Sequence, residues 1–112
     1  MNDAAVLNAL CAAARERRPV VLATVIRTRG SVPRHAGSTM LIDPAHGLVG
    51  TIGGGCGEAD VIAAAATVLA SGRPRLLEVE LMDAVESMSP AVCGGVMEIF
   101  VEPVTAGGGG AA

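Results

Sequence analysis

The stretch Val20–Ile26 reads Val-Val-Leu-Ala-Thr-Val-Ile, a nearly continuous run of apolar and β-branched residues. Such a run is typical of a central strand that is buried on both faces of a sheet. A strand of this kind needs other strands beside it and helices over it. The rest of the 112 residues must supply them within one small domain.

Two segments have helical spacing. The first begins at a capping Asn2 or Asp3 and ends before Pro19, and the second begins at Glu58 and ends at Ser71-Gly72. The stripes expected to be buried are Val6, Leu7, Leu10, Cys11 and Ala14 in the first helix and Val61, Ile62, Ala65, Val68 and Leu69 in the second.

Four more strands are predicted. Thr39–Asp43 and Leu48–Ile52 flank a turn of Asp, Pro and Gly, with His46 at its tip, and form a hairpin. Arg75–Leu81 and Val96–Glu102 follow the second helix, and their alternation predicts that Leu77, Val79 and Leu81 share one face of the first strand and Met97, Ile99 and Val101 one face of the second. The order α-β-β-β-α-β-β predicts a small two-layer α/β or α+β domain with a mixed sheet of about five strands, one strand pair being parallel. This domain spans residues 1–104, and residues 105–112 form a flexible Gly/Ala tail.

The composition excludes several classes of function. All eight basic residues are Arg, which excludes a P-loop lysine and a Schiff-base lysine. One Phe, no Tyr or Trp and a net charge of −3 argue against nucleic-acid binding. No apolar run is long enough to span a membrane, and we expect a cytoplasmic protein with three free thiols. Residues 1–46 carry a net charge of +3 and residues 47–112 a net charge of −6, which indicates either two differently solvated faces or an anion site built from the first half.

The segment Gly53-Gly54-Gly55-Cys56-Gly57 joins the predicted hairpin to the second helix. A glycine turn before a helix points backbone N–H groups at one spot, which suits an oxyanion, although a tight turn without a ligand explains it equally well. It is neither a dinucleotide fingerprint nor a P-loop. Cys56 between two glycines is expected to be a reachable thiol, and Cys93 also precedes two glycines.

A predicted loop from Arg27 to Ser38 contains Arg27, Arg29 and Arg34. Their guanidinium groups either bind phosphate or carboxylate or are simply solvated. No structural zinc site is expected, because the chain has no Cys-x-x-Cys pair and His35 and His46 lack ligand spacing.

Together these segments resemble the N-terminal domain of the XdhC/CoxI family over about residues 5–104. The motifs are Arg27–Arg34 with Gly37 and Met40, Gly50–Glu58, and Cys93-Gly94-Gly95 running into Phe100–Pro103. The resemblance implies an accessory factor of molybdenum hydroxylases such as xanthine dehydrogenase and carbon monoxide dehydrogenase. Such a factor binds molybdenum cofactor (molybdopterin) transiently, protects it during sulfuration with a cysteine desulfurase, delivers it to the apoenzyme and is not the oxidoreductase itself.

The resemblance also implies the site. Cys56 is expected to contact molybdenum or relay sulfur, and Cys93 is a second thiol. The other cofactor-binding residues are expected to be Arg29, Arg34, Gly53, Gly54, Gly55 and Gly57. Many members continue into a Rossmann-like domain, so we expect a separate chain with that domain or a homodimer. Two alternatives stay open: a module that docks hydroxylase and desulfurase without cofactor, and a sulfur-transfer protein that uses Cys56.

Overall fold

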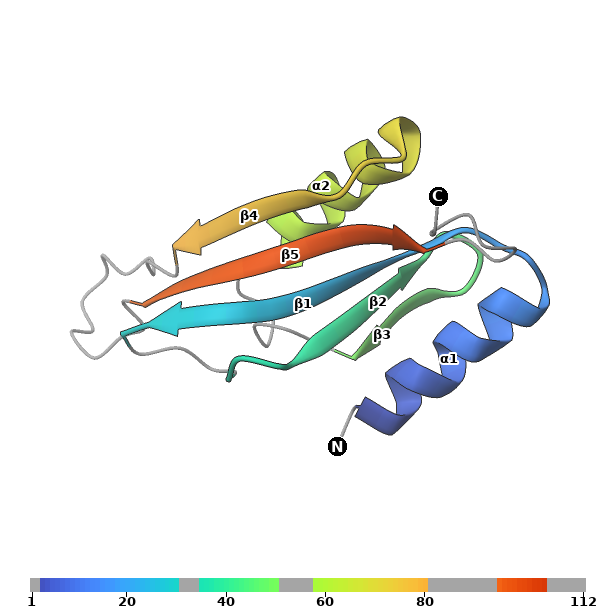
Figure 1. The fold of residues 1–112 in the computed structure, drawn as a ribbon, viewed down its shortest axis with the longest axis horizontal. Helices are drawn as coiled ribbons and strands as arrows, with labels where there is room; N and C mark the ends of the chain where they lie inside the picture. Colours follow the sequence, from blue (N-terminus) through green and yellow to red (C-terminus); the bar gives the residue numbers. More distant parts are fainter. Residues whose placement is uncertain (1–2, 31–34, 51–57, 81–94, 105–112) are drawn as a thin grey trace.

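The computed structural model describes residues 3–30, 35–50, 58–80 and 95–104. Within these residues, two helices and five strands follow one another in the predicted order (Figure 1). They are α1 (Asp3–Arg15), β1 (Val20–Arg29), β2 (Thr39–Asp43), β3 (Gly47–Gly50), α2 (Glu58–Ser71), β4 (Arg75–Glu80) and β5 (Val96–Val104). The prediction of a small α+β domain is confirmed.

The sheet has the strand order β3-β2-β1-β5-β4, and each neighbouring pair is antiparallel. The prediction of a mixed sheet with one parallel pair is therefore wrong. β3 and β4 do run in the same direction, but they lie at opposite edges with three strands between them. The last strand, β5, enters between β1 and β4 and pairs with both, which makes every contact antiparallel.

β1 is the longest strand and lies at the centre of the sheet, as its apolar run predicts. It continues through Arg27, Thr28 and Arg29, where the sequence predicts a loop. Among the described strands, only β5 pairs with this extension, because the pairing of β1 with β2 stops at Thr24↔Thr39. A register shift between Val25 and Arg27 marks a bulge, where Ile26 is exposed.

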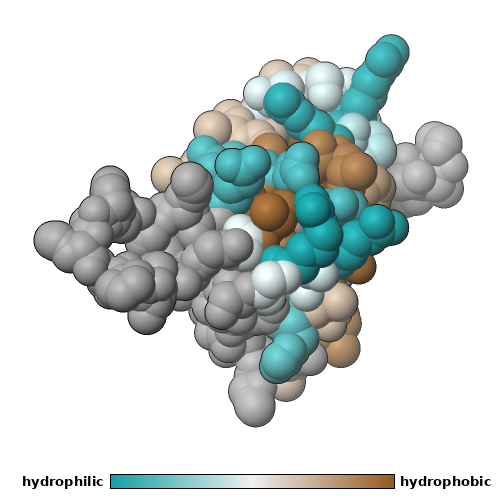
Figure 2. Space-filling view, turned by 90° about the vertical axis from the view of Figure 1, so that its left-hand side faces the viewer, coloured by the Kyte–Doolittle hydropathy of each residue, from teal (hydrophilic) through white to brown (hydrophobic). Residues whose placement is uncertain are grey.

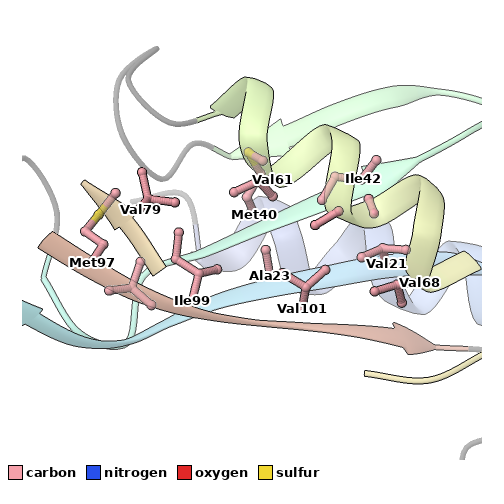
Figure 3. Packing of buried hydrophobic residues seen from close by; sticks show 13 residues of the cluster. Val21, Ala23, Met40, Ile42, Val61, Val68, Val79, Met97, Ile99 and Val101 are labelled. Atoms are coloured by element: carbon pink, nitrogen blue, oxygen red, sulfur yellow. The ribbon is translucent and has the colours of Figure 1, made fainter. Parts of the chain in front are cut away.

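The main core lies between α2 and one face of the sheet (Figure 3). Alternate residues of β1 and β5 point toward the helix, as period-two alternation requires. Met97, Ile99 and Val101 share this face, as predicted. The helix contributes Val61, Ala64, Ala65 and Val68, whereas Ile62, expected in the stripe, is exposed. The strands β1, β2, β4 and β5 contribute Val21, Ala23, Val25, Met40, Ile42, Val79, Met97, Ile99 and Val101.

α1 packs against the opposite face, so the sheet has a helix on each side rather than the predicted two layers. Its buried residues Val6 and Ala13 contact Val20 and Leu41, which alternate with the residues that face α2. α1 contacts β2 and β3, at one side of the sheet. Cys11 is exposed and does not belong to the buried stripe, because Val6, Leu10 and Ala13 define a helical face that excludes it.

The turn between β2 and β3 is anchored by Asp43, which is 4 % exposed. The amides of Ala45 and His46 donate hydrogen bonds to its Oδ1 at 2.9 and 3.3 Å, as the predicted turn chemistry requires. Nη1 of Arg18, just after α1, lies 2.7 Å from each carboxylate oxygen. This ion pair, which the sequence did not reveal, ties the end of α1 to the hairpin.

Burial raises the pKa of the Asp43 carboxyl group. The hydrogen bonds and charge of Arg18, together with the hydrogen bonds from the two turn amides, outweigh burial and hold the pKa of Asp43 below its ordinary value of 3.8. The carboxylate is therefore stabilised in its charged form, and the fold depends on that charge.

Gly50 has a positive φ of 85° and lies where α1 crosses the end of β3. A Cβ at this position would lie 2.9 Å from the carbonyl oxygen of Thr39 and 2.9 Å from Cγ2 of Val6. We expect Gly50→Ala to lower the free energy of unfolding by roughly 2 kcal/mol or more, because backbone strain and a steric clash add. The matched control is Gly47→Ala, where φ is 97° but the space is open; strain alone costs about 1 kcal/mol there. The free energies of unfolding are measured by urea unfolding. Equal losses for Gly50→Ala and Gly47→Ala would contradict the close approach of α1 to Gly50.

Candidate functional site

The antiparallel topology brings described residues that flank the motif segments toward one end of the sheet (Figure 1). Figure 2 looks onto this end, where hydrophilic side chains surround a small hydrophobic area among the described residues. Gly30 follows β1, Glu80 ends β4, and Gly95 precedes β5 at this end. Gly50 ends β3 and is set back from this end, because β3 pairs with β2 and β2 pairs only with the first part of β1; Glu58 begins α2. Three of the described residues next to the motif segments, Gly30, Glu80 and Gly95, therefore lie at one end of the sheet.

Most of the predicted site residues lie outside the described ranges, and Arg29 is the one that the structure places. The others are Arg34, Gly53, Gly54, Gly55, Cys56, Gly57 and Cys93. Arg29 is the last residue of β1, and its Nη2 lies 3.1 Å from Oε2 of Glu78 on β4. Both side chains are more than half exposed. An exposed pair of this kind is worth at most about 1 kcal/mol, so it leaves Arg29 available to an anion.

The side chain of Arg29 lies on the face of the sheet away from α2. Its cross-strand partner is Val96, and the residues of β5 that face α2 are the alternate ones, Met97, Ile99 and Val101. Nε of Arg27 lies 3.8 Å from Oε1 of Glu98 on the same outward face. The described residues thus place Arg29 opposite the face that carries the start of α2.

The N-terminus of α2 directly follows the glycine and cysteine segment. The first backbone N–H groups of a helix have no partner within the helix, and the helix dipole makes this end favourable for an anion. The acidic Glu58 and Asp60 occupy the first turn. They interact favourably with the dipole themselves and partly offset its attraction for another anion.

Among residues 3–30, 35–50, 58–80 and 95–104, no group of three or more His, Cys, Asp or Glu side chains could hold a metal ion. His35 and His46 are both exposed, and His46 lies at the hairpin turn as predicted. Within the same residues, no helix is long and apolar enough to cross a membrane.

Taken together, the described residues define a small α+β domain with an antiparallel sheet, in which Gly30, Arg29 and Gly95 lie at one end. A sequence profile of the XdhC and CoxI family matches residues 13–80, and the chain belongs to this family. The matched region contains two of the three motif segments.

Two similar proteins are considerably longer than this chain. The uncharacterized protein YqeB of Escherichia coli (strain K12) is 35 % identical over 83 residues, which are 74 % of this chain and 15 % of that protein. A crystal structure described as that of a xanthine dehydrogenase (BH1974) from Bacillus halodurans superposes with a TM-score of 0.76 and 30 % sequence identity. That match covers 93 % of this chain and 31 % of the solved chain.

Proposed function

We propose that this chain is a maturation factor for a molybdenum hydroxylase, which holds molybdenum cofactor transiently in the cytoplasm and delivers it to the apoenzyme. The observation that carries the proposal is the family match over residues 13–80, which includes both the arginine segment and the glycine and cysteine segment. The similar solved chain is described as a xanthine dehydrogenase, which supports a hydroxylase of this class as the partner.

The donor set fits the cofactor chemically. Molybdopterin carries a phosphate, which suits backbone N–H groups of glycines beside a helix N-terminus and the guanidinium of an arginine. A cysteine thiolate is a soft ligand suited to molybdenum. We therefore propose that Gly53, Gly54, Gly55 and Gly57 bind the anionic groups and that Cys56 contacts the metal or its sulfur, with Cys93 as a second thiol. When bound, the cofactor supplies the redox centre that the hydroxylase uses.

The two arginines are not equivalent in this proposal. Arg29 is paired with Glu78 on the face away from α2, whereas Arg34 follows it in the segment that joins β1 to β2. We expect Arg34→Ala to weaken cofactor retention more than Arg29→Ala does. Equal effects of the two substitutions would contradict this ranking and give both side chains the same part in binding.

Transfer to the apoenzyme tests the proposed function directly. Released molybdenum cofactor is incubated with the chain and then with a molybdenum hydroxylase apoenzyme, and the activity regained is measured against cofactor added alone. We expect the chain to raise the yield of active hydroxylase and to slow the loss of cofactor before transfer. A cysteine desulfurase and a chain with a Rossmann-like domain are added in separate arms. If no arm exceeds cofactor alone, the delivery role is wrong.

A second candidate is a docking module that binds hydroxylase and desulfurase without holding cofactor. The observation that favours it is the exposure of large apolar side chains, among them Leu7 and Leu76 at 58 % and 57 %. Binding of both partners that is unchanged in Cys56→Ala and Arg34→Ala, without cofactor retention by the wild type, would favour this function over delivery.

A further inference from the structure

One face of the sheet is only half covered. α1 lies over β2 and β3 and reaches the start of β1 and the end of β5, where Val20, Leu22 and Val104 belong to its apolar cluster. The rest of β1 and β5, and all of β4, carry no described helix on that side. Figure 1 looks onto this face, with α2 behind β4 and β5. We call it the open face; its side chains on β1, β5 and β4 are those that alternate with the residues facing α2.

The open face contains an apolar row that crosses the strands. Thr24 is the cross-strand partner of Phe100, and Phe100 is the partner of Leu76. Leu76, on the edge strand β4, is 57 % exposed. Together with the half-buried Phe100 it gives this face a small apolar area.

A pocket opens at the other end of this row, between α1 and the sheet. It has a volume of about 270 Å³ and is lined by Val6, Leu7, Leu10, Leu22, Gly37 and Thr39. Thr39 is the cross-strand partner of Thr24, so the pocket lies beside the row. The open face thus has an exposed apolar side chain, Leu76, on β4 and an apolar pocket beside β1.

The charges of the open face are also separated between its two outer strands. Arg27 and Arg29 lie on β1, and Glu78 and Glu80 lie on β4. In register, Arg27 and Glu78 share one row across β5, and Arg29 and Glu80 share the next. One side of the face is therefore basic and the other acidic, with β5 midway between them. Within one chain these charges are already partly paired, since Arg29 lies 3.1 Å from Glu78 and Arg27 lies 3.8 Å from Glu98.

We propose that the open face is the interface of a homodimer, with a second copy of the chain lying face to face on it. A twofold axis parallel to β5 and midway between the two sheets places β1 of each copy over β4 of the other. Each cross-strand row then faces the same row of the second copy. Arg27 and Arg29 then face Glu78 and Glu80 of the second copy, and Phe100 faces its counterpart. Leu76 of each copy comes over Thr24 of the other, beside the pocket. An isologous contact requires this kind of self-complementarity.

Two acids on the axis oppose their own counterparts. Glu98 is offset by Arg27, whose Nε lies 3.8 Å from its carboxylate. Glu102 is the partner of Leu22 in the register, forms no ion pair within the described residues and faces the second Glu102. Glu102→Gln therefore removes a like-charge contact, and it strengthens the dimer.

The test is sedimentation velocity on the full chain over a range of concentrations, at low and high salt. The wild type forms a dimer, and salt weakens it. Two double variants reverse one side each: Arg27→Glu with Arg29→Glu, and Glu78→Arg with Glu80→Arg. Each alone associates at least about tenfold more weakly, or about 1.4 kcal/mol, because like charges then meet. An equimolar mixture of the two variants restores the dimer, since every contact is again between opposite charges.

The reversed side chains are exposed, so folding is verified by circular dichroism and urea unfolding. The matched control is Arg73→Glu, an exposed arginine that precedes β4 and lies outside the open face; it leaves association unchanged. A wild type that stays monomeric at all concentrations overturns the proposal and leaves the face to another chain. A dimer that tolerates either double variant, or a mixture that fails to associate, overturns it as well.

Discussion

Asp43→Ala is expected to lower the free energy of unfolding by roughly 3 kcal/mol. The substitution removes a carboxylate that is 4 % exposed and that accepts hydrogen bonds from Arg18, Ala45 and His46. The guanidinium of Arg18 keeps only its contact with Glu16, at 2.6 Å. Both the β2–β3 turn and the attachment of α1 are affected. Urea unfolding at neutral pH gives the difference directly.

The same carboxylate makes stability depend on pH in a defined direction. Because the folded pKa of Asp43 is lowered, its contribution is fully present above the ordinary value of 3.8 and is lost as the pH falls through the folded pKa. Asp43→Asn keeps the shape and removes the charge, so it should lose stability at neutral pH and lose less on acidification. The matched control is Asp60→Asn at an exposed carboxylate, with an effect within about 0.5 kcal/mol. Parallel acid curves for wild type and Asp43→Asn would contradict the lowered pKa.

The local elements were predictable because their signals are local. The run at residues 20–26 predicts the central strand, and Asp43, Pro44 and Gly47 predict the hairpin turn, whose hydrogen bonds form within three residues. Alternation in residues 75–81 and 96–102 also placed Val79, Ile99 and Val101 on the buried face correctly. These patterns depend on the period of the strand and not on its partner.

Strand partnership was not predictable in the same way. The chain order suggested that the strand after α2 pairs in parallel within its strand–helix–strand unit, yet β4 pairs with β5 and β5 pairs with β1. These contacts join residues far apart in the sequence, and apolar alternation on one strand does not specify which edge it meets. The salt bridge between Arg18 and Asp43 depends on the same long-range packing.

Arg29 is the candidate site residue that the structure places, and it lies in a strand where the sequence predicts a loop. Arg27-Thr28-Arg29 is polar and precedes Gly30, which favours a loop in the sequence. In the structure β5 continues to pair with these residues after β2 has ended, so they form a strand with exposed side chains. The roles of Cys56, Cys93, Arg34 and the glycines remain proposals that depend on the family.

The largest functional effect is expected from Cys56→Ala. Loss of a thiolate that contacts the metal or its sulfur should reduce retention of molybdenum cofactor by about tenfold or more, the scale on which changes around metal ligands act. Cys11→Ala is the matched control, since Cys11 is an exposed cysteine on α1 that belongs to none of the motif segments. Its removal should leave retention unchanged.

The measurement that tests the central claim is molybdenum retained by the purified chain after incubation with released cofactor and gel filtration, determined by elemental analysis. Wild type and Cys11→Ala are measured beside Cys56→Ala, with and without a partner chain that carries a Rossmann-like domain. We predict that molybdenum co-elutes with wild type and Cys11→Ala and is largely absent from Cys56→Ala. A wild type that retains no molybdenum in either arm, or a Cys56→Ala variant that retains as much as wild type, would contradict the account.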